Sequence, residues 1–417
     1  MTRHDLTTWV DGAHGSLHDI DHLPYAVVAS EDPAVPTQVG VRIGDRVLLA
    51  GQAARALRPE WEPLLVGDSI NALMAAGPDT WGEVRSWLQT LLSHPACAAD
   101  LTLRGIDEVR CLLPFEVADY VDYYASIDHA TNVGRMFRPD GEPLLPNWRH
   151  LPVAYHGRAG SIVVSGTDVV RPCGQRRGAD GGDPVFGPSL TLDIEAELGF
   201  VVGRSVPHGT RVGTTELDRT VFGVVGVNDW SARDLQAWEY VPLGPNLGKS
   251  FATSVSAWVT PLAALEHARV PGPEQRPDVL PYLQDDGPHG LDVSVEVELN
   301  GHVVARPPYA SMYWSPAQML AHLTVNGAAL RVGDLFASGT ISGPRREERG
   351  SFLELSWAGA EPFAVGDGRR TFLEDGDEVV LRYLAPTRRG RLALGEVRGR
   401  IVPAIDDVIW RAGGGPG

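Results

Sequence analysis

The sequence predicts a β-rich α+β protein, in which a small N-terminal unit precedes a larger domain of rolled or sandwiched sheets. Three observations predict this class. Short segments of alternating apolar and polar residues, separated by turn residues, dominate from about residue 116 onward. Apolar residues at helical spacing are frequent before that point and rarer after it. The chain has no internal repeat. Because the pattern changes near residue 115, we expect one domain at residues 1–115 and a second at residues 116–417.

The N-terminal unit combines a hairpin with helices. The segment TQVGVRIGDRVLLAG predicts two short strands joined by a Gly-Asp turn. SINALMAAG and DTWGEVRSWLQTLLS carry apolar residues at helical spacing, in the second segment at Trp81, Val84, Trp87, Leu88, Leu91 and Leu92. The unit ends near LLPFE and holds no cluster of reactive side chains. We expect it to serve packing or to support an oligomer.

The larger domain is predicted to be built from strands. In LTLDIEAELGFVV the apolar residues alternate with Thr191, Asp193, Glu195 and Glu197, which predicts one continuous central strand. LDVSVEVELNGHVVAR predicts a hairpin that turns at Asn300-Gly301, and SFLELSW and GDEVVLRYL predict further strands. MYWSPAQMLAHLTVNG predicts a helix with Ser315 as its N-cap and Gly327 as its stop. The polar, Pro- and Gly-rich segment EHARVPGPEQRPDVLPYLQDDGPHG predicts a surface loop.

Composition limits the classes of partner. The 417 residues carry a formal net charge of -17, which argues against nucleic acid and anionic membrane surfaces as partners. Cys97, Cys111 and Cys173 are widely spaced and lack a CxxC pattern, so neither a disulfide framework nor a zinc site is expected. The N-terminus has no apolar stretch of signal-peptide length, and no apolar run is long enough to cross a bilayer. We expect a soluble, cytoplasmic protein.

Four acidic residues indicate a cation site. Glu195 and Glu197 are two positions apart in a predicted strand, so both side chains leave the same face and can reach one ion. Asp122 in DYYASIDH and Asp229 in VNDWSARD stand in similarly well-formed segments. Carboxylates repel one another, and a hard divalent cation is what usually holds several of them together. The alternative is an exposed strand edge with solvated charges, which the apolar opposite face disfavours.

The segment VFGVVGVNDWSARDLQAWEY predicts a strand that ends at Asn228-Asp229 and a helix opened by a Ser231–Asp234 capping box. Arg233, Gln236 and Tyr240 then share one helix face and could bind an oxyanion and a carboxylate. A solvated helix face is the simpler explanation of this spacing alone. In the following VPLGPNLGKSFATS, Lys249 and Thr253 lie among glycines that allow close approach to a ligand. The glycine spacing of a phosphate-binding loop is missing, which excludes nucleotide binding there.

His129 is the candidate proton carrier. It lies in a dense polar run with Asp122, Tyr124 and Asp128, and imidazole is the side chain that most often moves protons at neutral pH. A single histidine among thirteen more often has a surface or structural role. A catalytic histidine is usually oriented by a carboxylate, and sequence spacing does not identify such a partner.

Taken together, the segments resemble the fumarylacetoacetate hydrolase family over essentially the whole chain. The resemblance is carried by DYVDYYASIDHATNVGRMFRP, LLPNWRHLPVAYHGRAGSIVVSGT, LDIEAELGFVVG, NDWSARDLQAWEYVPLGPNLGKSF, GDLFASGTISG and GSFLELSW. It implies an SH3-like N-terminal barrel, a C-terminal mixed β-sandwich roll of that family's type, and a homodimer with the active site near the interface.

The resemblance also implies roles for individual residues. Asp122, Glu195, Glu197 and Asp229 would hold a catalytic Ca²⁺ or Mg²⁺, and Asp229, Thr253 and the backbone of Lys249 a second, structural Mg²⁺. His129 would be the general base, oriented by Glu354. The implied substrate-binding set is Tyr124, Arg138, Tyr155, Gln236, Tyr240 and Thr340, and the implied oxyanion donors are Arg233, Gln236 and Lys249.

The implied reaction is metal-dependent hydrolysis of a carbon–carbon bond in a 1,3-diketo acid. In this family the expected substrate is 4-fumarylacetoacetate, which yields fumarate and acetoacetate in the last step of tyrosine and phenylalanine degradation. The alternatives are a related acylpyruvate or oxo-acid hydrolase or decarboxylase, and a metal-stabilised binding protein without turnover. Asp128 places an extra carboxylate beside the base. The sequence leaves the choice between Ca²⁺ and Mg²⁺ open.

Overall fold

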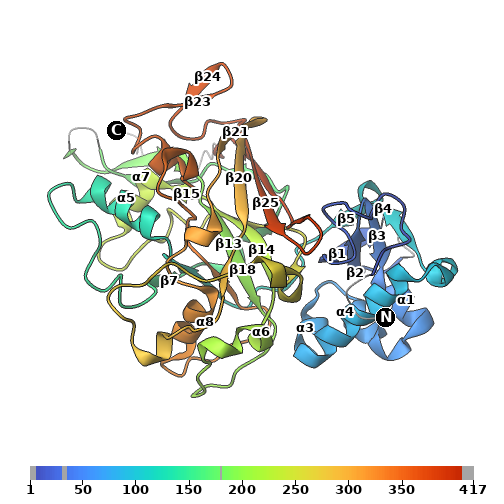
Figure 1. Ribbon diagram of the computed structural model, residues 1–417. Helices are drawn as coiled ribbons and strands as arrows, with labels where there is room; N and C mark the ends of the chain where they lie inside the picture. Colours follow the sequence, from blue (N-terminus) through green and yellow to red (C-terminus); the bar gives the residue numbers. More distant parts are fainter. Residues whose placement is uncertain (1–5, 31–34, 179–180, 406–417) are drawn as a thin grey trace, which may run out of the picture.

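The computed structural model describes residues 6–30, 35–178 and 181–405, and Figure 1 shows a smaller N-terminal unit beside a larger body. The β-rich α+β class that the sequence predicts is confirmed. Within the described residues, no helix combines the length and the apolar composition needed to cross a membrane. Cys97, Cys111 and Cys173 are free, as expected.

The N-terminal unit is built on an antiparallel sheet with the strand order β4-β3-β2-β1-β5. Its strands are β1 (Tyr25–Ser30), β2 (Gln38–Ile43), β3 (Arg46–Leu49), β4 (Leu103–Gly105) and β5 (Val109–Cys111). The predicted hairpin is confirmed, because β2 and β3 pair across a turn at Gly44, whose φ of 56° suits a residue without a Cβ.

Helices cover this sheet and continue its core. They are α1 (Ala50–Leu57), α2 (Glu62–Leu65), α3 (Asn71–Ala75) and α4 (Pro78–Ser93). Helix α4 buries Val84, Leu88, Leu91 and Leu92, which are four of the six positions that the periodicity singled out. A backbone bridge between Tyr25 and Val259 joins the N-terminal unit to the larger body.

The larger body contains a mixed sheet with the order β7-β6-β22-β13-β14-β16-β8, in which β17 also pairs with β14. Its strands are β6 (Tyr120–Tyr123), β7 (Ala154–His156), β8 (Ile162–Val164), β13 (Ala196–Val202), β14 (Val221–Asp229), β16 (Thr253–Val255), β17 (Thr260–Pro261) and β22 (Leu335–Ala337). Strand β13 lies between β22 and β14, so its central place is confirmed.

A second sheet has the order β21-β20-β25-β27-β9, and β26 pairs with β25. Its strands are β9 (Val169–Val170), β20 (Ser294–Leu299), β21 (His302–Ala305), β25 (Glu378–Pro386), β26 (Arg391–Ala393) and β27 (Val397–Val402). The β20–β21 hairpin turns at Asn300-Gly301, both with positive φ, as predicted.

Short strand pairs and helices complete the body. The pairs are β10 (Cys173–Arg176) with β11 (Val185–Pro188), β12 (Leu192–Asp193) with β15 (Ser231–Ala232), β18 (Arg269–Val270) with β19 (Gly290–Leu291), and β23 (Phe363–Val365) with β24 (Gly368–Arg370). The helices are α5 (Ile127–Phe137), α6 (Leu217–Thr220), α7 (Arg233–Glu239), α8 (Pro316–Thr324) and α9 (Phe352–Leu355). Ser315 caps α8 in a capping box with Gln318, which confirms that predicted start.

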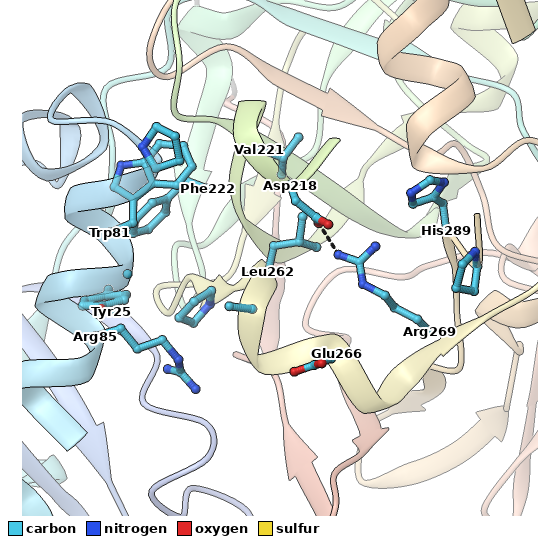
Figure 2. Close-up of a pocket in the computed structure, with 15 residues that line it drawn as sticks. Tyr25, Trp81, Arg85, Asp218, Val221, Phe222, Leu262, Glu266, Arg269 and His289 are labelled. Atoms are coloured by element: carbon cyan, nitrogen blue, oxygen red, sulfur yellow. Dashed lines mark hydrogen bonds and ion pairs between the residues drawn. The ribbon is translucent and has the colours of Figure 1, made fainter. Parts of the chain in front are cut away.

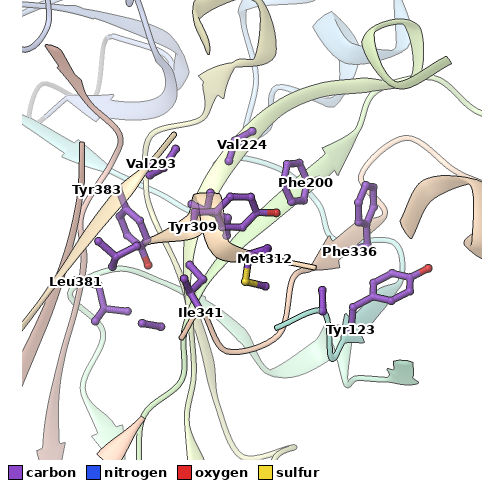
Figure 3. Packing of buried hydrophobic residues seen from close by; sticks show 14 of the residues in the cluster. Tyr123, Phe200, Val224, Val293, Tyr309, Met312, Phe336, Ile341, Leu381 and Tyr383 are labelled. Atoms are coloured by element: carbon purple, nitrogen blue, oxygen red, sulfur yellow. The ribbon is translucent and has the colours of Figure 1, made fainter. Parts of the chain in front are cut away.

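The core lies between the two sheets of the larger body. Figure 3 shows Tyr309 between Phe200 of β13 and Tyr383 of β25, and these three residues belong to one buried cluster with Val224 of β14 and Leu381 of β25. The ring of Tyr383 passes so close to Gly226 that a Cβ there would lie 2.3 Å from it. Its hydroxyl donates to the carbonyl oxygen of Val227 at 3.2 Å, which ties β25 to β14.

Strands β13 and β14 are buried on both faces. Phe200 and Val224 point into the core between the sheets, whereas Val201 and Val225 belong to a second cluster shared with the N-terminal unit. This double burial explains the continuous apolar run VFGVVGV, because a strand covered on both sides has no solvent face. A charged side chain on these strands is therefore removed from water.

Three local predictions are wrong. The segment LTLDIEAELGFVV is not one strand, because pairing breaks at Ile194 and Glu195 between β12 and β13. SFLELSW forms helix α9 and not a strand, since its N-cap serine satisfies the first turn. The Ser231–Asp234 capping box does not form: Ala232 is the N-cap of α7, and Asp234 accepts bonds from Ser189 and from the backbone of Leu190.

Candidate active site

A cavity of about 390 Å³ collects the polar residues of interest. It opens between α5, α7 and the ends of the β6, β7 and β13 strands. Among the residues that line it are Asp122, Tyr124, His129, Arg138, Tyr155, Glu195, Arg233, Gln236, Tyr240, Lys249 and Thr340. These residues come from segments far apart in the chain, and the mixed sheet brings them together.

Three carboxylates form a possible ion site. One oxygen atom each from Asp122, Glu195 and Glu197 lies within 4.8 Å of the others, and all three residues are buried. Sheet register brings them together, because Ala337 of β22 pairs with Asp122 on one side and with Gly199 on the other. Glu197 lies two positions before Gly199 on β13, on the same face of that strand.

Two of these carboxylates are incompletely satisfied. Oδ1 of Asp122 and Oε1 of Glu197 are buried and have no hydrogen-bond partner among the described residues. Burial, reinforced by the charge of Asp229, raises the pKa of Asp122 well above its usual value. Burial, reinforced by Asp122, does the same to the pKa of Glu197. Orphaned acceptor oxygens at one point are what a hard divalent cation requires, so the residues fit such an ion.

Glu195 is held differently from its two neighbours. Its carboxylate accepts a short hydrogen bond from Nζ of Lys249 and lies 2.9 Å from Nη1 of Arg233. Burial alone would raise the pKa of Glu195, but the charges of Lys249 and Arg233 outweigh it and lower that pKa to about 2. Glu195 is therefore ionised whether or not an ion is bound.

Asp229, the fourth predicted ligand, lies outside the group of three. Its Oδ2 accepts bonds from Nζ of Lys249 at 2.8 Å and from the hydroxyl of Tyr155 at 2.9 Å. Its Oδ1 accepts the hydroxyl of Thr253 at 2.6 Å, because Asp229 and Thr253 pair directly across β14 and β16. Asp229, Lys249 and Thr253 thus meet, as the second-ion prediction requires, but Lys249 contacts Asp229 through its ammonium group. Both ion assignments stay predictions.

His129 has a carboxylate partner. Its Nδ1 lies 2.6 Å from Oε2 of Glu354, and both side chains are buried. Ser126 is the N-cap of α5 and accepts the backbone N–H of His129, while Ser351 is the N-cap of α9 and accepts that of Glu354. Both residues therefore occupy the third position of a helix, where the backbone is fixed by the cap. This pairing agrees with the role that the resemblance implied for Glu354.

Glu354 is surrounded by donors. Besides His129, it accepts bonds from the hydroxyls of Ser342 and Ser351 at 2.8 Å each, and from the amide of Asn132 at 2.9 Å. Burial would raise the pKa of Glu354, but the charge of His129 and these hydrogen bonds lower it below its usual value. The carboxylate is ionised, so it selects the His129 tautomer that carries its proton on Nδ1.

The cations on the opposite wall are fixed by further contacts. Nε of Arg233 donates to Asp193 at 2.8 Å, and its Nη1 donates to Oε1 of Gln236 at 3.1 Å. Its Nη2 is buried and has no partner among the described residues, which leaves one donor for a ligand. Arg233, Gln236 and Lys249 all line the cavity, as the predicted oxyanion donors should.

The sequence did not identify Asp193 as part of this site. Its buried carboxylate binds Arg233 and also accepts the backbone N–H groups of Phe352 at 2.7 Å and Leu353 at 3.1 Å. Asp193 thereby joins Arg233 to helix α9, which carries Glu354. The sequence carries a signal for α9, because Ser351 precedes Glu354 by three residues, but the apolar alternation in SFLELSW favours a strand.

The predicted substrate-binding residues all lie around the cavity. Oγ1 of Thr340 is buried without a partner among the described residues, and the ring of Tyr124 meets His129 edge-on with 5.2 Å between centroids. Arg138 and Tyr240 are exposed. Arg138 donates to the carbonyl oxygens of Glu142 and Pro143. The cavity thus has a charged, buried end and a mouth with a cation and a phenol.

A larger cavity of about 550 Å³ lies elsewhere, between α4 and the segment around Leu262 (Figure 2). Trp81 and Phe222 form its apolar wall, and Asp218 pairs with Arg269 on the other side. Its other acidic lining residue among those described is Glu266, so it lacks a carboxylate cluster like the one beside His129. The smaller cavity is therefore the candidate active site.

Comparison with known proteins agrees with this geometry. A family model described as fumarylacetoacetase N-terminal matches residues 21–119, and one described as fumarylacetoacetate (FAA) hydrolase C-terminal matches residues 120–402. The chain belongs to the fumarylacetoacetate hydrolase family. The family models meet at Asp119, immediately before β6, which carries Asp122.

Relatives of similar length are found across eukaryotes. The fumarylacetoacetase of Caenorhabditis elegans is 43% identical over 96% of this chain and 100% of its own length. The fumarylacetoacetase of Homo sapiens is 42% identical over 95% of this chain and 99% of its own. Among solved structures, the fumarylacetoacetate hydrolase from psychrophilic Exiguobacterium antarcticum superposes with a TM-score of 0.54 at 18% identity, covering 92% of this chain and 100% of that one. This structural similarity supports the fold.

Proposed function

We propose that this protein is a metal-dependent hydrolase that cleaves 4-fumarylacetoacetate with water into fumarate and acetoacetate. The observation that carries the proposal is that one cavity is lined by His129, which is paired with Glu354, and by Asp122 and Glu195, which form a carboxylate group with Glu197. The curated relatives of matching length, 43% and 42% identical, are named fumarylacetoacetases, which supports this choice of substrate.

Asp122, Glu195 and Glu197 would hold the ion, and Asp229 would complete the set if Lys249 shifted its ammonium group. We favour Ca²⁺ or Mg²⁺, because the donors are carboxylate oxygens only. When bound, such an ion would bring Lewis-acid polarisation of the substrate's carbonyl groups and partial neutralisation of the enolate product. A relative of the same fold, the maleylpyruvate hydrolase of Sphingobium sp. SYK-6, is described in complex with manganese(II) and pyruvate.

The base would be Nε2 of His129. Because Glu354 accepts the proton of Nδ1, the other ring nitrogen has a free lone pair, and His129 lines the cavity. Nε2 would take one proton from a water molecule as the water oxygen forms a bond to the substrate's carbonyl carbon. The imidazolium would then be stabilised by the ionised Glu354 until the proton is passed on.

The negative charge that develops on the attacked carbonyl oxygen would be stabilised by the cavity wall that carries Arg233. Nη2 of Arg233 is the unused donor there, and Gln236 and Lys249 lie beside it. Cleavage of the carbon–carbon bond would leave the electron pair on the acetoacetate fragment, which takes up a proton. Arg138 and Tyr240 at the mouth would bind a carboxylate end of the substrate, which explains how a chain of net charge -17 accepts an anion.

Exposed apolar residues lie at the end of α7 and just after it: Trp238 is on the helix, and Val241, Leu243 and Leu247 are in the segment that follows. They support a homodimer with its interface near the cavity. We place the enzyme in the cytoplasm, where the free cysteines Cys97, Cys111 and Cys173 suit a reducing environment.

The test is product analysis by the purified protein. Fumarylacetoacetate, its saturated analogue and an acylpyruvate are each incubated with Ca²⁺ or Mg²⁺, and again after treatment with a chelator. We expect fumarate and acetoacetate in equal amounts, loss of turnover on chelation, and at least a tenfold lower kcat/KM for the acylpyruvate, about the least discrimination that one added or missing methylene produces. Faster cleavage of the acylpyruvate would contradict the substrate, and turnover that survives complete ion removal would contradict the metal.

A further inference from the structure

Asn132 makes a contact that the proposed mechanism does not use. It lies three residues after His129 on α5, so the two side chains leave the same face of the helix. His129 reaches Oε2 of Glu354 at 2.6 Å, and Nδ2 of Asn132 reaches Oε1 of the same carboxylate at 2.9 Å. Asn132 is absent from the cavity wall, and its side-chain amide contacts the site through Glu354.

The two oxygens of Glu354 have different environments. Oε2 accepts His129 and the hydroxyls of Ser342 and Ser351, whereas Oε1 accepts the amide of Asn132 alone among the described residues. A carboxylate shares its charge between both oxygens, and a donor on one of them reduces the proton affinity of the whole group. A less basic Glu354 stabilises the neighbouring imidazolium less.

We propose that Asn132 is a positioning residue that tunes the basicity of His129 by holding Oε1 of Glu354. The lowered pKa of Glu354, to which the Asn132 bond contributes after the charge of His129, is consistent with this role. Without the amide donor, Glu354 attracts the Nδ1 proton more strongly and the imidazolium persists to higher pH. Since the base must be neutral to accept a proton, activity then begins at a higher pH.

The other charged and titratable groups around this pair do not change with Asn132. They are Asp128 on α5, Glu348 beside Asp128, Tyr124 before α5, Glu195 before β13, and Arg349, which donates to the backbone carbonyl of Glu354 at 2.8 Å. A shift seen on substitution of Asn132 is therefore attributable to the lost amide bond.

The experiment compares Asn132→Ala and Asn132→Leu with the wild type. Leu keeps most of the side-chain volume and removes the donor, whereas Ala removes both. A packing role predicts that Leu behaves like the wild type and that Ala loses activity equally at all pH values. The proposed role predicts that both variants shift the acidic limb of the kcat/KM profile upward by about half a pH unit, which lowers kcat/KM at neutral pH by up to about threefold.

Thr131→Ala is the matched control, because Thr131 is the neighbour on α5 and does not line the cavity. The kinetic readout rests on the proposed function, so a second readout is needed that does not require turnover. The titration of His129 is followed by NMR in the ion-loaded, substrate-free protein. The His129 signal is assigned by its loss in His129→Asn. An upward shift of the His129 titration in both variants supports the proposal even if the wild type fails to cleave fumarylacetoacetate. An unchanged titration in a folded Leu or Ala variant overturns it, and the volume-conserving Leu variant serves if Ala does not fold.

Discussion

Glu354→Gln tests the base assignment most directly. The substitution keeps the shape of the side chain and removes one buried charge 2.6 Å from Nδ1 of His129. Glu354 does not line the cavity, so substrate contacts and KM should change little. Two unit charges about 4 Å apart interact by about 4 kcal/mol at an effective dielectric constant of about 20. Only part of this interaction is lost, because the amide oxygen of the glutamine can still accept the Nδ1 proton. Losing about two-thirds of that interaction in the transition state corresponds to a decrease of about 10² in kcat.

The assay is steady-state hydrolysis of fumarylacetoacetate over the pH range in which the protein stays folded. Without its anionic partner the imidazolium is less stable, so the acidic limb of the kcat/KM profile should move to lower pH, opposite to the shift expected for Asn132→Ala. Glu361→Gln is the matched control, because Glu361 is exposed and its nearest cation is Arg346 at 3.6 Å. A kcat within about threefold of the wild type, with an unmoved limb, would refute the assignment.

Three further outcomes are expected. Glu197→Gln removes the cost of ionising a buried carboxyl group beside Asp122, so the melting temperature of the ion-free protein should rise while the Ca²⁺ affinity measured by calorimetry falls at least about tenfold. Arg233→Lys replaces a fork that binds Asp193 and Gln236 by a single ammonium group, and should lower kcat by about 10²–10³ with fumarylacetoacetate; normal turnover would exclude Arg233 as an oxyanion donor. The pKa of Glu195 is depressed from 4.5 to about 2. The ionised Glu195 therefore contributes to the free energy of unfolding of the ion-free protein above pH 4.5, and this contribution is lost as pH falls toward 2. The free energies of unfolding of wild type and Glu195→Gln, measured by urea titration, should converge over that interval.

Local features of the fold could be predicted where a short segment carries its own signal. The Asn300-Gly301 hairpin and the capped start of α8 depend on φ preferences and on a side chain bonding to a nearby backbone N–H. Helix α9 cannot be told from a strand by its pattern, because four helical residues contain too few positions to separate a period of two from one of 3.6. The break before Ala196 has no local sequence signal, because it is set by the change of pairing partner from β15 to β14.

The sequence by itself indicated that Glu195 and Glu197, two positions apart, could reach one ion, and that Glu197 lies on a central strand, and its resemblance to a family supplied the expected partners. Tertiary structure decided how those carboxylates differ. Lys249 and Arg233 approach Glu195 from a loop and a helix and hold it ionised, whereas Asp122 and Glu197 each keep a buried oxygen without a hydrogen-bond partner among the described residues. It also decided that Glu354, 225 residues away from His129, is surrounded by four side-chain donors, because only the folded chain sets the distances and the burial on which proton affinity depends.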